Sequence, residues 1–302
     1  MNKKILYFFN PLSAEGNAPQ YWKKARALAE FLPEKPYDLT EVENKVELIE
    51  RNDPDLVVVA GGDGSINSIC RAVMSTKKRP TIAVMPVGFG NALAYALGVE
   101  TLEKSLDVIA RSPQTIELDL MKTSVPDFPY AVFNLSVGFD ARIIHRRMTD
   151  RYIGMRSYVL SAIRSFLEHT NKQMVFTVDH SVTISATASS LVIANSPTIG
   201  KNWIVSDSAY LNDGLLDCTL FSSKFVYLTN LRLKGFKHPL FNNSGKVRFK
   251  ARHIQVEGEP LVQIDGDPRV LSAHLEVEVL PKSLRMLAND AKNIDAAYVP
   301  FL

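Results

Sequence analysis

One stretch of the sequence constrains the fold more than any other. Residues 55–60 (DLVVVA) form an apolar run rich in β-branched side chains, which is typical of a parallel strand covered on both faces. The glycine-rich turn GGDGS follows at residues 61–65, and apolar residues then recur at helical spacing through Met74. A buried strand, a tight turn and an amphipathic helix in this order predict an α/β sheet.

The same alternation runs through the first 120 residues. Helical spacing recurs between short apolar runs that are bounded by turn residues, so several more units of this kind are expected. Further strands are predicted at 4–9, 37–42 and 80–85, and further helices at 20–32, 43–52 and 91–98. The pattern predicts an open parallel sheet with helices on both faces.

Beyond about residue 122 the pattern changes to period-two alternation, which indicates antiparallel strands. Such runs occupy 173–179, 182–195, 215–221, 247–256, 260–264 and 274–280. Two helices, 152–168 and about 224–235, interrupt them. We predict an α/β N-terminal domain with a parallel sheet (1–122) and a C-terminal antiparallel β-sandwich domain (123–282), and the segment of about 283–302 is a candidate to pack back on the first domain.

Composition excludes some classes of function. The chain has 35 Lys and Arg against 32 Asp and Glu, a dispersed net charge of +3 that does not indicate nucleic-acid binding. Cys70 and Cys218 lie far apart without a CxxC motif, which predicts buried free thiols in a reducing compartment. No apolar stretch approaches the roughly 20 residues that span a bilayer. We therefore expect a cytoplasmic protein whose contact with lipid is peripheral, and a homodimer is left open.

The turn at residues 61–65 has the chemistry of a phosphate site. Glycines after a parallel strand let the backbone N–H groups approach a ligand, and the next helix presents an electropositive N-terminus. The alternative is a plain Gly-Asp-Gly turn. The GxxxxGK[ST] motif is absent, and Leu93 stands where a GxGxxG motif starting at Gly88 needs its third glycine.

Two more polar turns follow predicted strands of the same half. They are 10-NPLSAEGN-17 and the start of 86-PVGFGNALAYALG-98. Turns that follow parallel strands open on the same edge of a sheet, where α/β folds bind ligands. Three of them together predict a nucleotide site.

The order NPxS, GGDG[ST]xN, PxGxGNALA, LxDGxLD and DG[ED] resembles the diacylglycerol kinase catalytic-domain family, over nearly the whole chain. This family includes bacterial lipid kinases, sphingosine kinases and ceramide kinases. The resemblance implies an NAD kinase-like or lipid kinase-like fold and transfer of the γ-phosphoryl group from ATP, with Mg²⁺, to a lipid hydroxyl of diacylglycerol-like or sphingoid-like type. It implies that ATP contacts Asn10, Pro11, Leu12, Ser13, Ala14, Thr40, Gly61, Gly62, Asp63, Gly64, Ser65, Asn67, Gly88, Phe89 and Asn91.

The resemblance also implies three catalytic carboxylates. Asp63 matches an aspartate that acts on the phosphates through Mg²⁺ or on the acceptor hydroxyl. Asp265 and Asp267 lie in 263-QIDGDP-268, where the family normally has a glutamate as general base at the position of Asp267. Carboxylates suit both tasks, because they bind hard cations and accept protons. The alternative for this element is a plain Asp-Gly hairpin turn.

A structural Mg²⁺ site is implied by 209-AYLNDGLLDC-218, where the family's bacterial members bind the ion through an aspartate and backbone carbonyls. The metal would lie at Tyr210, Asp213 and Leu215. The alternative is a type I′ Asp-Gly hairpin without metal.

Besides Asp267, three positions depart from the family pattern. Phe89 stands where relatives have Thr or Ser, and Ala14 replaces a glycine of the first turn. Arg142 falls where sphingosine kinases have an aspartate that holds the amino-alcohol head, which favours a neutral or anionic lipid. The helix 152–168 corresponds to the region that lines the family's lipid tunnel, although such apolar stripes are usually core. A kinase for a soluble acceptor such as NAD, and a nucleotide-binding protein with weak or lost transfer activity, are the alternative functions.

Overall fold

The structure is a computed structural model that describes residues 3–88, 90–112, 114–149, 155–199, 203–206, 208–230, 232–233, 245–258, 261–271 and 274–289. The chain divides into two compact units. The first consists of Met1–Asp119, Ile199–Asn202 and Lys282–Leu302, and the second of Leu120–Thr198 and Trp203–Pro281. The domain boundary predicted at residue 122 lies inside a strand, β5 (Gln114–Thr123), and stays a prediction.

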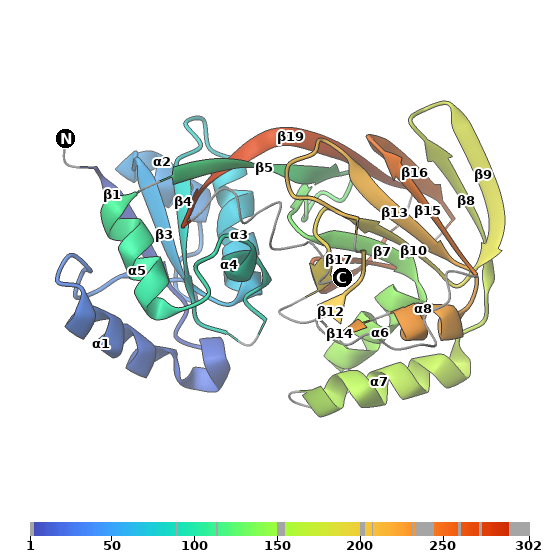
Figure 1. The fold of residues 1–302 in the computed structure, drawn as a ribbon, viewed down its shortest axis with the longest axis horizontal. Coiled ribbons are helices and arrows are strands. Elements are labelled where there is room, and N and C mark those ends of the chain that lie inside the picture. Colours follow the sequence, from blue (N-terminus) through green and yellow to red (C-terminus); the bar gives the residue numbers. More distant parts are fainter. Residues whose placement is uncertain are drawn as a thin grey trace. The chain divides into compact units, whose positions relative to one another are not determined.

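The first unit is a parallel sheet with helices on its faces (Figure 1). The strand order is β2-β1-β3-β4, and Met286 of β19 (Leu275–Ala288) pairs in parallel with Ile82 of β4. The strands are β1 (Ile5–Phe9), β2 (Tyr37–Asp38), β3 (Leu56–Gly61) and β4 (Thr81–Pro86). The helices are η1 (Ser13–Gly16), α1 (Ala18–Leu28), α2 (Lys45–Asn52), α3 (Asp63–Met74), α4 (Ala92–Ala96) and α5 (Leu102–Arg111).

The β-branched run of β3 explains why this sheet forms. Val57, Val58 and Val59 are fully buried, because helices cover both faces of the central strands. Burying each of these side chains contributes about 1.5–3 kcal/mol. The helices begin at local caps: the Asn44 side chain accepts a hydrogen bond from the N–H of Glu47 and thereby starts α2.

The second unit contains two antiparallel sheets. One has the order β15-β13-β10-β7-β17-β18, and in the other the N-terminal part of β19 pairs with β16, which continues to β8 and β9. A small sheet joins β11, β12 and β14. The remaining elements are β6 (Tyr130–Ala131), β7 (Asn134–Gly138), α6 (Phe139–Thr149), α7 (Met155–Glu168), β8 (Lys172–Val178), β9 (Val182–Ala188), β10 (Ser190–Ala194), β11 (Thr198–Ile199), β12 (Trp203–Ile204), β13 (Leu216–Phe221), α8 (Lys224–Asn230), β14 (Arg232–Leu233), β15 (Lys246–Ala251), β16 (His253–Glu257), β17 (Leu261–Ile264) and β18 (Asp267–Val270).

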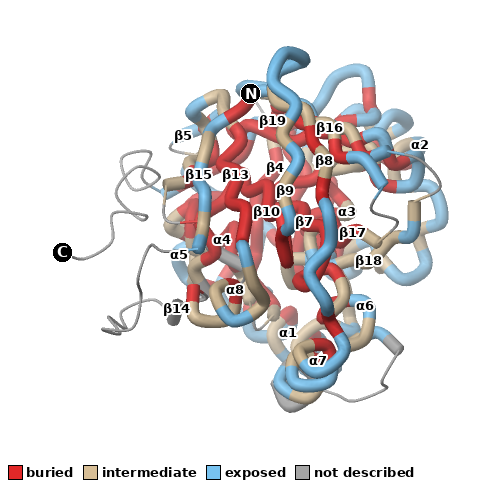
Figure 2. Tube along the Cα trace, turned by 90° about the vertical axis from the view of Figure 1, so that its right-hand side faces the viewer, coloured by how far each residue is buried: buried red, intermediate tan, exposed pale blue. Residues whose placement is uncertain are grey.

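The core of the second unit combines side chains of both sheets. Met174 and Phe176 of β8 belong to the same buried cluster as Leu191 and Ile193 of β10. Strands β7, β10 and β13 are buried along their length, whereas β9 is largely exposed (Figure 2). A parallel α/β sheet followed by an antiparallel second sheet confirms the predicted fold class.

Three predicted elements need correction. The runs 182–195 and 247–256 each form two strands that lie in different sheets, with breaks at Ser189 and Arg252. Period-two alternation continues across these breaks, so the sequence pattern could not reveal them. The helix predicted at about 224–235 ends at Asn230, whose side chain bonds the Val205 carbonyl and the Lys246 ammonium. The patterns also fail to predict α5 and α6.

Gly138 lies at a close backbone contact in the second unit, where β7 passes into α6. Its φ is +87°, and a Cβ atom added there would lie 2.3 Å from the Ser189 carbonyl oxygen. We predict that Gly138→Ala lowers the free energy of unfolding by about 2–5 kcal/mol, measured by urea denaturation. Gly258→Ala is the control, because Gly258 has a φ of +72° but open space around it. That variant should lose only about 1–2 kcal/mol, and equal losses would contradict the prediction.

Candidate functional site

The carboxyl ends of the parallel strands meet at one edge of the first unit's sheet. The register pairs Phe9 with both Asp38 and Ala60, and it pairs Gly61 with Pro86. The chain therefore leaves β1, β2, β3 and β4 at nearly the same level. The turns that follow are the segments that the sequence marks as nucleotide-binding.

Two of these turns approach each other through their backbones. A Cβ atom on Gly88 would lie 2.9 Å from the Cα of Gly62, and a Cβ atom on Gly61 would lie 2.5 Å from the Cβ of Ser65. Neither distance is compatible with a larger residue. The N–H of Val87 also donates to the Gly61 carbonyl at 2.9 Å. Gly88 is therefore needed for the contact between the two turns, and Gly61 for the close packing of Ser65 within the second turn.

Side chains of the first turn bond the second. The Asn10 amide donates to Ser65 Oγ at 2.8 Å, and the N–H of Gly62 donates to Ser13 Oγ at 3.3 Å. Asn10 Oδ1 in turn accepts from the N–H of Leu12 at 3.0 Å, which shapes the first turn. The first two of these three hydrogen bonds join residues that are 55 and 49 positions apart in the sequence.

Asp63 connects the second turn to the third. Its Oδ1 accepts a hydrogen bond from the N–H of Ala92 at 2.8 Å, at the start of α4. Asn91 precedes this helix with a left-handed φ of 47°, and its amide donates to the Gly88 carbonyl at 2.7 Å. One oxygen of the predicted catalytic carboxylate thus positions the GNALA turn. Sequence reasoning missed Ala92, because a backbone N–H leaves no signal in residue type.

The start of α3 is open to a ligand. Its N-cap residue, Gly62, provides no side-chain hydrogen bond to the first turn of this 12-residue helix. A Cβ atom on Gly64 would meet no atom within 4 Å. An uncapped helix N-terminus beside open space favours an anion, because the helix dipole and free N–H groups point there.

Two amide oxygens support a ligand at this edge independently. Asn67 is 2% exposed, and its Oδ1 has no hydrogen-bond partner among the described residues; the same holds for Asn91 Oδ1. Leaving a buried acceptor unbonded costs about 1–3 kcal/mol. Both oxygens could accept from donors that a nucleotide or its hydration shell supplies.

The remaining residues of the first turn give less support for contact with a ligand. Pro11 is half-buried, and Leu12 is exposed. Ala14 has a φ of 53°, a conformation that favours glycine. The replacement of the family's glycine by Ala14 therefore strains the backbone locally without preventing the turn.

Thr40 follows β2 at the same edge. Its N–H and its hydroxyl both donate to Asp38 Oδ1, at 2.8 and 2.7 Å, while the N–H of Leu39 donates to the Phe9 carbonyl. Thr40 thus lies beside the end of β1, where it was predicted to contribute. Phe89 lies outside the described residues.

In the second unit, Asp265 and Gly266 form the turn of a two-residue hairpin. Ile264 of β17 pairs with Asp267 of β18, and both turn residues have positive φ, 51° and 88°. This is the geometry of a type I′ turn, which Asp-Gly favours. The turn fixes the position of Asp267 as the first residue of β18.

The Asp265 carboxylate accepts hydrogen bonds from backbone N–H groups. Its Oδ1 accepts from the N–H groups of Phe133 and Asn134 at 2.8 and 3.1 Å, and its Oδ2 accepts from the N–H of Val132 at 2.8 Å. A carboxylate bonded in this way is held in place and anchors the segment before β7. We assign Asp265 a positioning role rather than a direct one.

A buried polar network supports the same hairpin. Gln263 accepts a hydrogen bond from the N–H of Gly266 at 2.9 Å and donates to Asp140 Oδ2 at 3.3 Å. Ser136 and Tyr227 also donate to Asp140. Burial raises the pKa of Asp140, although these three donors oppose the shift. No short-range sequence pattern could have found this network, because its members are joined only by the fold.

Asp267 differs from the other carboxylates of this region. It is half-buried, and no hydrogen bond or ion pair joins its side chain to another residue within the described part of the chain. The hairpin holds Asp267 in place without using its carboxylate oxygens. Such a carboxylate can accept a proton.

In the predicted metal loop, residues 209–218, the Lys250 ammonium contacts the carboxylates. Lys250 Nζ lies 2.8 Å from Asp213 Oδ2 and 3.0 Å from Asp217 Oδ2, and it donates to the Ser208 carbonyl at 3.2 Å. The Tyr210 ring lies 5.7 Å from this ammonium. Burial raises the pKa of Asp217, while Ser208 and Lys250 oppose that shift.

The loop is not the type I′ hairpin considered as the alternative. Gly214 has a positive φ, whereas Asp213 does not, and the N–H of Leu215 donates to Asp213 Oδ1 at 3.1 Å. Within the described ranges no three His, Cys, Asp or Glu side chains group as metal ligands. The Lys250 ammonium competes with a cation for the Asp213 carboxylate, which argues against Mg²⁺ here, and the metal site at Tyr210, Asp213 and Leu215 stays a prediction.

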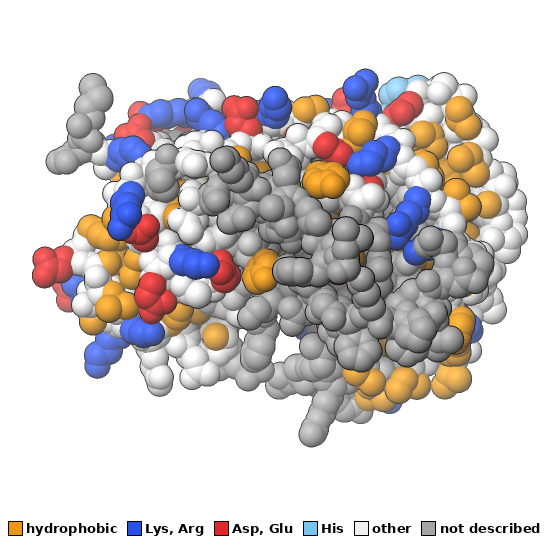
Figure 3. Space-filling model, viewed as in Figure 1, with side chains coloured by type: hydrophobic (Ala, Val, Ile, Leu, Met, Phe, Trp, Pro, Cys, Tyr) orange, Lys and Arg blue, Asp and Glu red, His pale blue; other side chains and the backbone are white. Residues whose placement is uncertain are grey.

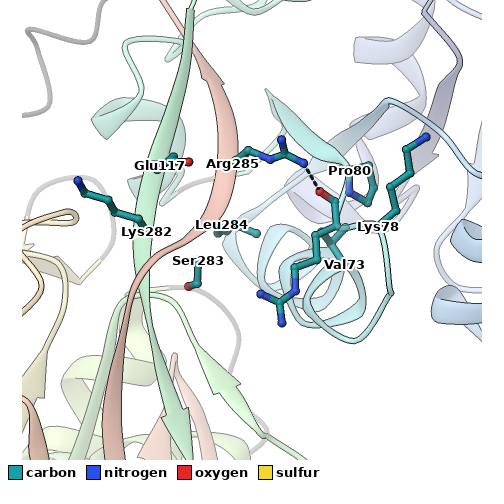
Figure 4. Close-up of a pocket in the computed structure, with 9 residues that line it drawn as sticks. Val73, Lys78, Pro80, Glu117, Lys282, Ser283, Leu284 and Arg285 are labelled. Carbon is teal, nitrogen blue, oxygen red and sulfur yellow. Dashed lines mark hydrogen bonds between the residues drawn. The ribbon is translucent and has the colours of Figure 1, made fainter.

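A hollow of about 250 Å³ lies elsewhere in the first unit (Figure 4). It is bounded by Pro80, just before β4 begins, and by residues 282–285 of β19. The Arg285 guanidinium donates to the Arg79 carbonyl there at 2.9 Å. Pro80 marks the amino edge of the parallel sheet, so this hollow is separate from the glycine turns.

The fold combines a mostly parallel α/β sheet with an antiparallel second sheet, and each unit contains one group of the predicted site residues. The family model "Diacylglycerol kinase catalytic domain" matches residues 4–123, and "YegS C-terminal NAD kinase beta sandwich-like domain" matches residues 134–288. The chain belongs to this diacylglycerol kinase catalytic-domain family, with a YegS-type C-terminal domain.

Similar proteins agree with this family. A Staphylococcus haemolyticus protein named "Putative lipid kinase" is 24% identical over 242 residues, 78% of this chain and 77% of that protein. A Staphylococcus epidermidis protein of the same name is 25% identical over 248 residues, 80% and 79%. The crystal structure of a "putative diacylglycerol kinase" from Bacillus anthracis has a TM-score of 0.72 at 22% identity and covers 96% of this chain and 98% of that one.

The fold is shared more widely. An NAD kinase from Archaeoglobus fulgidus, solved in complex with ATP, has a TM-score of 0.52 at 14% identity, with 97% of both chains covered. Among the described segments, no helix combines the length and the apolar character that crossing a bilayer requires. Cys70 and Cys218 are buried and form no disulfide bond, as predicted.

Lys250 provides a test of the metal loop. We predict that Lys250→Met lowers the free energy of unfolding by about 1–3 kcal/mol at neutral pH, because it leaves the nearly buried Asp217 without its cation. Loss of the cation raises the folded-state pKa of Asp217 further, so the deficit should grow as the pH rises from about 4 towards 7. Urea denaturation across this pH range measures the effect.

Lys250→Arg is the control that keeps the charge, and it should retain most of the stability. The wild-type midpoint should be the same in EDTA and in MgCl₂. A midpoint that rises with Mg²⁺ would contradict the assignment of Lys250 as the resident cation.

Substitutions of Asp265 and Asp267 should affect the stability of the protein differently. We predict that Asp265→Asn lowers the free energy of unfolding by about 1–3 kcal/mol, because one carboxylate oxygen becomes a donor facing backbone N–H groups. Asp267→Asn should change it by less than about 0.5 kcal/mol. Urea denaturation checks both variants, and a large loss for Asp267→Asn would show that this residue is structural.

Proposed function

We propose that this chain transfers the γ-phosphoryl group of ATP to the hydroxyl group of a lipid. The observation that carries the proposal is the joining of three glycine turns by Asn10, Ser13 and Asp63 around the open N-terminus of α3. Membership of the diacylglycerol kinase family supports a lipid as the acceptor.

In the proposed binding mode, the backbone of Gly61, Gly62 and Gly64 admits the phosphates, and the start of α3 provides positive electrostatic potential. Asn67 and Asn91 accept hydrogen bonds from the nucleotide or its hydration shell. Asn10, Pro11, Leu12, Ser13, Ala14, Thr40, Ser65, Gly88 and Phe89 form the remaining proposed contacts.

Mg²⁺, entering with ATP, would neutralise charge on the phosphates during transfer. Asp63 is the carboxylate of this edge that would hold it, because a nucleotide-bound Mg²⁺ needs only one or two protein carboxylates. Asp63 keeps its bond to Ala92 in this role, so it also maintains the third turn.

Asp267 is the proposed general base. The lipid hydroxyl oxygen attacks the γ-phosphorus, the bond from that phosphorus to the β,γ-bridging oxygen breaks, and the hydroxyl proton moves to the Asp267 carboxylate. The products are ADP and a phosphorylated lipid. Asp265 and Gln263 keep the hairpin rigid and thereby orient the base.

Arg142 supports a neutral or anionic acceptor lipid. It is half-buried in α6, and its Nε has no hydrogen-bond partner among the described residues. Burial lowers the pKa of His169 to about 4, and Arg142 adds to this effect by charge repulsion. A sphingoid ammonium would meet the same repulsion.

A transfer assay with radiolabelled ATP tests the function. The acceptors are diacylglycerol, monoacylglycerol, sphingosine, ceramide and NAD, and we expect label on diacylglycerol or monoacylglycerol. Asp267→Asn should reduce kcat by about 10²- to 10⁴-fold, because it removes the base, with the dissociation constant of ATP changed less than about twofold. Asp267→Glu, which restores the residue usual in the family, should keep turnover.

Label on NAD alone would identify a kinase for a soluble acceptor. Measurable ATP binding without transfer to any acceptor would instead identify a nucleotide-binding protein. Parallel loss of ATP affinity and turnover in Asp267→Asn would remove Asp267 from the catalytic role.

A further inference from the structure

Helix α7 exposes an apolar stripe to solvent. Val159, Ile163 and Leu167 are 56%, 54% and 77% exposed, and their spacing of four residues puts them along one side of the helix. Figure 3 shows hydrophobic side chains gathered along this helix. The stripe runs through the segment that the sequence left open as core or as lipid tunnel, and these three residues are not core.

The buried side of α7 is small and polar instead. Ser161 and Ser165 are fully buried, and His169, just after the helix, is 4% exposed. These residues repeat at the same spacing of four on the opposite side, where α7 packs against α6. For these residues the polarity of a usual surface helix is inverted, while Leu160, Ala162 and Phe166 are half-buried. Packing of the second unit does not explain why the outer side is apolar.

Neighbouring helices extend the same character. Met148 of α6 is 59% exposed, and Phe225 of α8 is 65% exposed. Lys224 joins α8 to the end of α7, since its ammonium donates to the carbonyls of Phe166 and His169. Phe225 follows Lys224 directly, so it lies near the end of α7 that carries Leu167.

The segment around the stripe is basic. Residues 139–172 contain seven Lys and Arg against three Asp and Glu, an excess of four that is larger than the net charge of +3 of the whole chain. Among them, Arg146 forms an ion pair with Glu168. An apolar stripe with a cationic surround is complementary to a bilayer surface that contains anionic lipids.

We propose that Val159, Ile163 and Leu167, the α7 stripe, dock this protein on a membrane containing anionic lipid. The proposal rests on the proposed function in one respect: a lipid acceptor must be reached at a bilayer surface. The apolar side chains enter the boundary between headgroups and acyl chains, and the excess positive charge of residues 139–172 favours anionic headgroups.

Vesicle sedimentation without ATP tests this surface separately from catalysis. The full chain is mixed with vesicles of phosphatidylcholine alone or of phosphatidylcholine with phosphatidylglycerol. We expect binding to the mixed vesicles that weakens with added salt. The double variant Ile163→Gln and Leu167→Gln should weaken binding by about tenfold or more.

The control is the double variant Val182→Gln and Val247→Gln on strands β9 and β15. Val182 and Val247 are 54% and 61% exposed, comparable with the stripe, but they lie in strands outside α6, α7 and α8. This variant should bind like the wild type, and circular dichroism should show that both variants are folded. Phosphorylation of a soluble short-chain diacylglycerol should be equal in all three proteins if the proposed function is right.

Unchanged vesicle binding of the α7 variant would overturn the proposal, as would equal binding to vesicles of phosphatidylcholine alone. A dimer in gel filtration that the α7 variant converts to a monomer would also overturn it, because the stripe would then cover a second copy of the chain. If the wild type binds the mixed vesicles as expected but does not phosphorylate the soluble acceptor, only the proposed function is contradicted.

Discussion

The parallel pairing of β1, β3 and β4 is the constraint on which the candidate nucleotide site depends. Pairing in register brings Phe9, Gly61 and Pro86 to one edge, so the turns that follow must share the same space. Gly88 has no room for a side chain because the backbone of Gly62 lies against it, and Gly61 has none because Ser65 occupies that space. Because helices cover both faces of the sheet, its strands consist mostly of apolar residues, and the polar side chains lie in the turns.

The second unit shows how carboxylates are assigned to different tasks. Asp265 is bonded by three backbone N–H groups, and Asp213 and Asp217 share the ammonium of Lys250. Buried or half-buried charge needs such partners to be stable. Asp267 lies two residues from Asp265, on the same hairpin, yet has no comparable partner in the described part of the chain, and this difference supports its proposed role as general base.

The proposed membrane surface follows from the same reasoning about burial. Ser161 and Ser165 allow α7 to approach α6 closely, which leaves Val159, Ile163 and Leu167 outside. Burial of apolar side chains is favourable, and the proposed membrane contact would supply for the stripe the burial that the fold does not. A lipid kinase would have such a partner in the bilayer that contains its acceptor.

The amino-acid sequence by itself determined the fold class, the family and the locations of the three turns. These features depend on local patterns: a β-branched run before GGDG, helical spacing after it, and period-two alternation in the second half. The breaks at Ser189 and Arg252 could not be predicted, because a strand that crosses between sheets keeps the same alternation.

Only the tertiary structure decided how the charged residues are used. Lys250 lies 37 residues from Asp213, and the partners of Asp265 lie more than 130 residues away, so no spacing in the sequence connects them. The same holds for the inverted burial of α7, which depends on the side that packs against α6. Local sequence sets backbone conformation, whereas the partner of a charge and the buried side of a helix are set by contacts between distant segments.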